Sequence, residues 1–219
     1  MTAGPAIALD ELELDALAEL VNIGVNRAAA SLRTMIEQEV ILSVPEVQVV
    51  TRAEAARIIG ERNHEKLVAV HQAFEGEISG RALLIFPETN SLELVRAVTG
   101  GELPLEDIIE LEQEALAETG NVILNGCLAT IANMLHRNLN ISLPEIVRGA
   151  GAEIFNLAGA SDDEDVALFL YIDFVVKERD IRGYIAMLMD LPALTSLKRL
   201  LGDLIDRAGH AAGTHAGAR

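Results

Sequence analysis

The sequence predicts an α/β (α+β) sandwich made of two homologous halves related by a pseudo-two-fold axis. We expect a six-stranded, mainly antiparallel sheet with two long helices on one face. The main observation behind this prediction is a motif that occurs twice, at a constant offset of 99 residues. It reads Asp15-Ala-Leu-Ala-Glu19-Leu-Val-Asn22 in the first half and Glu114-Ala-Leu-Ala-Glu118-Thr-Gly-Asn121 in the second.

A proline follows each copy of this motif at the same distance. Pro45 and Pro144 each lie 23 residues after the motif's Asn, within Ser-x-Pro-Glu. Agreement of Glu, Asn and Pro at one offset has a chance probability of roughly one per cent, so we interpret it as an internal duplication. Each proline is assigned a structural role, because proline restricts its own backbone and that of the residue before it, and so favours the start of a strand.

The first half has the pattern of a long helix followed by strands. Apolar residues recur at helical spacing from Leu14 to Leu32 and are expected to face a core. A turn through Glu75-Gly-Glu separates two apolar strand patterns, and Pro87 ends the second of them. The predicted elements are a helix at 11–37, a strand at 47–50, a helix at 53–60, strands at 66–74 and 80–86, and a helix at 91–98.

The second half repeats this order after a Gly- and Pro-containing joint at 100–106. The second half is six residues longer than the first, and we expect the insertion at the acidic turn around 161–165. The predicted elements are a helix at 106–138, a strand at 146–148, strands at 166–176 and 184–189, and a helix at 193–207. We therefore predict a single domain over 1–207, with halves at 11–100 and 106–207, and a disordered tail at 208–219 that is rich in Gly, Ala and His.

The spacing of the repeated motif places its polar residues on one side of each helix. Residues advance by about 100° along a helix, so the acidic residues and Asn fall within roughly 60° of one another, opposite the apolar stripe. Each helix is therefore expected to present a carboxylate and a carboxamide one turn apart and pointing outward. A solvated helix face is the ordinary explanation for such residues, and their repetition in register is what favours a site.

This motif resembles the one that defines the CheC/CheX/FliY family of chemotaxis phosphatases, and the two copies most resemble the two-site CheC members. The family pattern is Asp/Ser-x3-Glu-x2-Asn with a proline 23 residues later. Asp15, Glu19, Asn22 and Pro45 match it fully. In the second copy Glu118, Asn121 and Pro144 match, whereas Glu114 replaces the usual Asp or Ser.

The resemblance implies hydrolysis of the aspartyl phosphate on a CheY-type response regulator. It implies that Asn22 and Asn121 orient the attacking water and that Glu19 and Glu118 anchor the regulator through its active-site lysine. Asp15 and Glu114, one turn earlier, become candidates for partner binding, and a solvated role is equally compatible with their position. The chain then needs no cofactor of its own, since Mg²⁺ belongs to the regulator. This fits the chemistry, because phosphoryl transfer depends on positioning and charge neutralisation and a carboxamide can orient a water.

Composition excludes several other classes of function. The net charge of −17 opposes binding to nucleic acid. We expect no membrane segment, and the single cysteine, Cys127, fits a cytoplasmic protein without disulfides. No metal site is expected, because the five histidines are scattered and none lies beside the repeated motif: His64, His71, His136, His210 and His215.

A non-catalytic interaction protein is the alternative from another class. The resemblance allows a flagellar-switch component or an adaptor that binds a deamidase of the CheD type. Switch proteins of this superfamily carry an additional C-terminal β-rich domain, which the 219 residues do not accommodate, so a switch subunit is the less favoured of the two.

Overall fold

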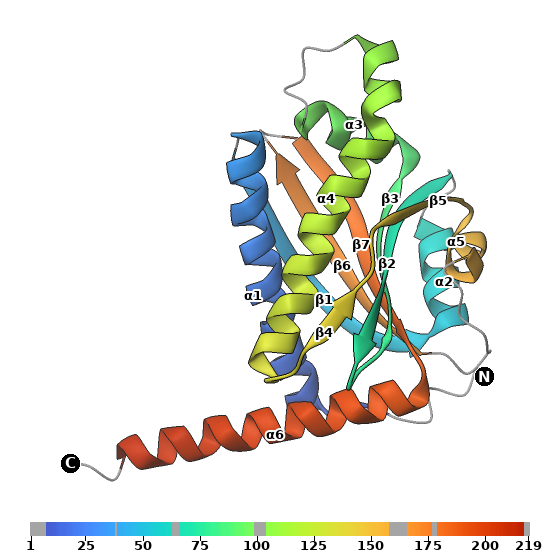
Figure 1. The fold of residues 1–219 in the computed structure, drawn as a ribbon. Coiled ribbons are helices and arrows are strands. Elements are labelled where there is room, and N and C mark those ends of the chain that lie inside the picture. Colours follow the sequence, from blue (N-terminus) through green and yellow to red (C-terminus); the bar gives the residue numbers. More distant parts are fainter. Residues whose placement is uncertain are drawn as a thin grey trace.

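An antiparallel sheet forms the centre of the fold in the computed structural model of this chain (Figure 1). The structure describes residues 8–37, 39–62, 66–98, 104–157, 166–176 and 179–216. Within these residues seven strands pair in the order β1-β6-β7-β3-β2-β4, with β5 also paired to β2, and every pairing is antiparallel. The strands are β1 (Val40–Thr51), β2 (Leu67–Gly76), β3 (Gly80–Pro87), β4 (Leu139–Ile141), β5 (Glu145–Gly149), β6 (Val166–Val176) and β7 (Arg179–Met189). The prediction of a mainly antiparallel sheet is confirmed.

The prediction of six strands is wrong, because the edge of the sheet beside β2 is divided in two. β4 pairs with β2 from Phe74 to Gly76, and β5 pairs with it from Leu67 to His71. The three residues between β4 and β5 end in Pro144, which has no N–H to contribute to a ladder. Pro144 therefore immediately precedes β5, and it is the last residue of the break that separates β5 from β4.

Pro45 has a different position from the one predicted. β1 begins at Val40, so the proline lies inside the strand and does not precede it. The pairing of β1 with β6 shifts register between Ser43 and Glu46, where Pro45 lies. A bulge leaves one residue out of the ladder, and this is where an edge strand can accommodate a proline.

The helices cover both faces of the sheet. α1 (Glu11–Ile36), α3 (Glu88–Val98) and α4 (Leu105–Met134) share one apolar core with the sheet, and α6 (Leu191–Ala216) packs into the same core across one end. α2 (Arg52–Arg62) and α5 (Gly151–Leu157) cover the opposite face over a smaller cluster. Figure 1 shows α1 and α4, the two motif-bearing helices, running antiparallel beside each other.

Local sequence explains how α1 begins and how closely it approaches α4. Asp10 accepts a hydrogen bond from the N–H of Glu13, whose side chain in turn caps Asp10, so the helix starts with a capping box. A methyl group on Gly24 would lie 2.8 Å from the Cα of Cys127, and one on Gly126 would lie 2.9 Å from the Cβ of Ala28. The two helices therefore cross where neither has a bulky side chain.

α6 is a third long helix, in addition to the two that were predicted. It continues to Ala216, although its predicted end was residue 207, so residues 208–216 are helical where a disordered tail was expected. Alanine has the highest helix propensity, and the four alanines of this segment outweigh its glycines. The predicted lead-in over residues 1–7, the acidic turn at 161–165 and residues 217–219 lie outside the described residues.

One helix of the described part, the Leu111–Met134 segment of α4, is long and apolar enough by composition to cross a membrane. Its mean hydropathy of 1.2 is only just high enough, and 56% of the segment is buried inside the protein. Burial against the sheet accounts for the apolar character of α4, because a helix in the middle of a core must be apolar on a wide face.

Candidate active site

The repeated motif places the same residue types on the surface of α1 and of α4. Glu19 and Glu118 are exposed, and so are Asp15 and Glu114 one turn earlier on each helix. Asn22 and Asn121 are half-buried. The acidic residues point outward as predicted, whereas the two carboxamides lie partly against the protein.

The side chain of Asn121 is held by two hydrogen bonds to its oxygen. The Nε2 of Gln72, on β2, lies 3.1 Å from the Oδ1 of Asn121, and the Nδ2 of Asn125, one turn later on α4, lies 2.7 Å from the same oxygen. A carbonyl oxygen has two lone pairs, so both acceptor positions are occupied. The carboxamide of Asn121 is therefore fixed in orientation before any partner arrives.

A glycine brings α4 close enough to the sheet for these contacts. Gly120 precedes Asn121, and a methyl group on it would lie 2.6 Å from the Cγ1 and 2.7 Å from the Cβ of Val70. Val70 lies on β2 two residues before Gln72. Since carbon atoms prefer about 3.5–4.0 Å, only glycine lets the helix backbone approach β2 so closely.

The break between β4 and β5 supplies the acceptor that orients Gln72. The Oγ of Ser142, the first residue of the break, accepts a hydrogen bond from the backbone N–H of Ala73 at 2.9 Å. In a continuous ladder this N–H would pair with a backbone carbonyl. The carbonyl of Ser142 instead accepts a hydrogen bond from the Nε2 of Gln72, also at 2.9 Å.

The site on α1 lacks this support. Within the described residues Asn22 makes no side-chain hydrogen bond, and Asn26, the counterpart of Asn125, is exposed. The residue at the position of Gly120 is Val21, whose side chain is buried in the core. Both helices therefore present a Glu and an Asn three residues apart, but only the α4 copy has a fixed carboxamide.

Three contributors to the α4 site were not predicted from the sequence: Gln72, Ser142 and Gly120. One signal was available for Gln72, since it interrupts the apolar alternation of Val68, Val70 and Phe74 on the strand face that packs against α4. A polar residue on a buried strand face needs a hydrogen-bond partner. The sequence could not identify that partner, which lies 49 positions away.

The histidines and acidic residues that the structure describes do not assemble a metal site. Among the described residues no group of three His, Cys, Asp or Glu side chains could hold an ion. Buried His71 lies 3.6 Å from the exposed Glu145, and burial lowers its pKa below the ordinary value. His71 alternates with Gln72 along β2, so it faces the opposite side of the sheet from α4.

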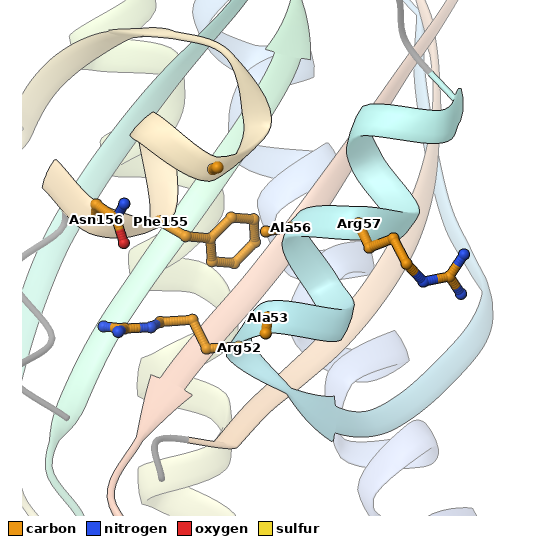
Figure 2. A pocket seen from close by; sticks show the side chains of 7 residues that line it. Arg52, Ala53, Ala56, Arg57, Phe155 and Asn156 are labelled. Carbon is orange, nitrogen blue, oxygen red and sulfur yellow. The ribbon is translucent and has the colours of Figure 1, made fainter. Parts of the chain in front are cut away.

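A separate hollow of about 400 Å³ lies between α2 and α5. Figure 2 shows the ring of Phe155 between the two helices, with Arg57 directed away from it. Arg57 is paired with Glu54 and Glu61, and its hydrogen bonds hold the pKa of the Glu54 carboxyl below the usual range. None of the predicted site residues lines this hollow, whose wall consists of Arg52, Ala53, Ala56, Arg57, Ala152, Phe155 and Asn156.

Comparison of the sequence with known proteins finds matches among the chemotaxis phosphatases. A family model described as chemotaxis phosphatase CheX matches residues 68–164. The CheY-P phosphatase CheC of Bacillus subtilis is 23% identical over 141 residues, covering 63% of this chain and 67% of the relative. The flagellar motor switch phosphatase FliY of the same organism is 24% identical over 200 residues, 90% of this chain, which spans only half the length of that protein.

The fold also matches a solved structure of this group. The crystal structure of Thermotoga maritima FliY superposes with a TM-score of 0.70 at 16% identity, covering 90% of this chain and all of the other. At this level of identity the match demonstrates a shared fold and no more.

Proposed function

We propose that this chain, which belongs to the CheC/CheX/FliY family, hydrolyses the aspartyl phosphate of a CheY-type response regulator. The similarity to relatives named as phosphatases supports this reaction class. A single observation carries the proposal: α4 presents the exposed carboxylate of Glu118 three residues before the carboxamide of Asn121, which is held by hydrogen bonds. The same two residue types, Glu19 and Asn22, recur on α1.

In this proposal the enzyme contributes position rather than covalent chemistry. Asn121 or Asn22 enters the regulator's active site and aligns a water with the phosphorus. The water oxygen forms a bond to phosphorus while the bond from phosphorus to the aspartyl oxygen breaks, and that electron pair stays on the aspartate carboxylate. One proton of the water passes to a phosphate oxygen, so the products are aspartate and inorganic phosphate.

The acidic residues serve to hold the regulator. Glu19 and Glu118 are exposed carboxylates that can pair with its active-site lysine, and Asp15 and Glu114 can extend the contact by one helical turn. Mg²⁺ is carried by the regulator as part of the substrate. The absence of a nucleic-acid partner belongs to the same proposal and is supported by the net charge of −17. A cytoplasmic location also belongs to it and is supported by the single cysteine.

The test mixes phosphorylated regulator and Mg²⁺ with the Asn22→Ala, Asn121→Ala or double variant and measures the release of inorganic phosphate. Removing a water-orienting group costs on the order of 2–4 kcal/mol, or roughly thirty- to a thousand-fold in rate. Each single variant keeps the activity of the other site, whereas the double variant loses nearly all activity. Asn133→Ala is a matched control, since Asn133 is an exposed Asn on α4 outside the motif.

The variants of Glu19 and Glu118 separate binding from chemistry. Alanine at either position is expected to raise the KM for phosphorylated regulator, and the affinity of the parent protein should fall as salt rises. Undiminished phosphate release by the double Asn variant would refute the assignment of catalysis to Asn22 and Asn121. Regulator binding without any hydrolysis would favour the non-catalytic alternative, in which the protein is a switch component or an adaptor for a CheD-type deamidase.

A further inference from the structure

A buried glutamine lies on the apolar face of β2 that packs against α4. Gln72 is 1% exposed, as are its neighbours on this face, Val70 and Phe74. Its Oε1 is buried and has no hydrogen-bond partner within the described residues. Burying an unpaired amide oxygen is unfavourable, so an apolar side chain would suit the fold better at this position.

The amide nitrogen of Gln72 determines which way Asn121 faces. The carbonyl of Ser142 can only accept a hydrogen bond, so the group that Gln72 turns toward it must be its NH₂. The second hydrogen of this NH₂ points to Asn121, which must therefore present its oxygen. Asn125 then donates to the same oxygen. One backbone carbonyl thus fixes the orientation of three carboxamides.

The consequence is that Asn121 offers its nitrogen to a partner. With both lone pairs of Oδ1 occupied, the free hydrogen-bonding capacity of Asn121 is the NH₂ group. Such a group holds a water through one of its lone pairs and leaves another lone pair of that water available to phosphorus.

The α1 site has no equivalent of Gln72. Val47 and Ile146 each lie two residues after the proline of their half, and they pair with Leu170 of β6 and Val70 of β2 respectively. Val70 of β2 is therefore equivalent to Leu170 of β6, and two residues further along these strands Gln72 corresponds to Ile172. An isoleucine side chain has no group that can donate a hydrogen bond.

We propose that Gln72 is a positioning residue for the α4 site: it holds Asn121 by its oxygen, aims its amide nitrogen at the attacking water, and makes this site the more active of the two. This rests on the proposed function, since the water is that of aspartyl-phosphate hydrolysis. Gln72 itself touches neither the water nor the regulator.

The experiment measures Gln72→Met in two backgrounds. Asn22→Ala leaves only the α4 site, where Gln72→Met should lower kcat for phosphorylated regulator about ten-fold with an unchanged KM. Asn121→Ala leaves only the α1 site, where the same substitution should change nothing. The kcat of the α4 site alone should also exceed that of the α1 site alone.

Two measurements separate positioning from a structural defect. The Tm of Gln72→Met should equal or exceed that of the parent, because the variant removes an unpaired buried oxygen. The side-chain NH₂ resonances of Asn121 in a ¹⁵N spectrum should shift or broaden, which requires no activity at all. Ser142→Ala should give the same spectral change, since Ala73 can then reclaim the carbonyl that orients Gln72.

The inference is overturned by an unchanged kcat in the Asn22→Ala background, by equal losses in both backgrounds, or by unaltered Asn121 resonances. The two proposals fail in different ways. If the double Asn variant loses activity but Gln72→Met leaves kcat unchanged in the Asn22→Ala background, only the positioning role is refuted. Full activity in the double Asn variant would refute the roles of Asn22 and Asn121, and with them this role. No phosphate release by the parent protein would refute the phosphatase function itself.

Discussion

Substituting Gly120 by alanine tests the close approach of α4 to β2 on which the α4 site depends. The new methyl group would lie 2.6 Å from the Cγ1, 2.7 Å from the Cβ and 2.8 Å from the Cγ2 of Val70. Rotating the Val70 side chain gives no relief, because its Cβ is itself too close. The helix must therefore move away from the strand by about 1 Å to reach an ordinary carbon–carbon distance.

Two opposing terms set the expected stability change. Overpacking of a core costs about 1–3 kcal/mol, whereas replacing glycine by alanine inside a helix gains about 1 kcal/mol. The net result for Gly120→Ala is a destabilisation of about 1 kcal/mol. The same displacement would stretch the 3.1 Å contact between Gln72 and Asn121 to about 4 Å, which is beyond hydrogen-bonding distance.

Urea denaturation provides the assay, and Gly202→Ala provides the matched control. Gly202 lies within α6, and a methyl group there would meet no atom within 4 Å, so only the favourable helix term applies. The two variants should therefore differ by about 2 kcal/mol in unfolding free energy. Equal stabilisation by both substitutions would show that α4 does not lie against β2 as described.

Three further predictions concern buried groups elsewhere. Burial raises the pKa of Cys127 to about 12, so a thiol reagent should label it only after unfolding, and labelling of the native protein would contradict its place in the core. Burial lowers the pKa of His71 despite the facing carboxylate of Glu145, so the unfolded chain binds the proton more readily. Stability should then fall as pH drops below about 6.5, and His71→Gln should flatten this dependence in urea titrations; an identical slope would exclude His71 as its source. Arg148→Ala removes the 2.7 Å partner of the largely buried Glu112 and should cost about 1–2 kcal/mol in the same assay, so an unchanged midpoint would contradict the pair.

Several features of this fold can be predicted because they depend on neighbouring residues. Helical spacing of apolar residues predicted α1 at 11–37, against the observed Glu11–Ile36, and the apolar run at 166–176 predicted the exact limits of β6. The exposure of Glu19 and Glu118 follows from the same spacing, since it fixes which side of a helix faces the core. The end of α6 was predicted less well, because a weakly patterned segment rich in alanine and glycine suits helix and coil about equally.

Tertiary structure decided how the two copies of the motif differ. By its sequence Asn121 is equivalent to Asn22, but its environment is made by Gln72, 49 positions away, and by the carbonyl of Ser142. Local pattern predicts which face of a strand is buried, but not which side chain of another element lies opposite it. The interruption of the edge strand before Pro144 and the glycine contact of α4 with β2 both arise from pairing between distant segments. For this reason the sequence determined where the two Glu/Asn pairs lie on the surface, and only the packed fold determined which carboxamide is held in place.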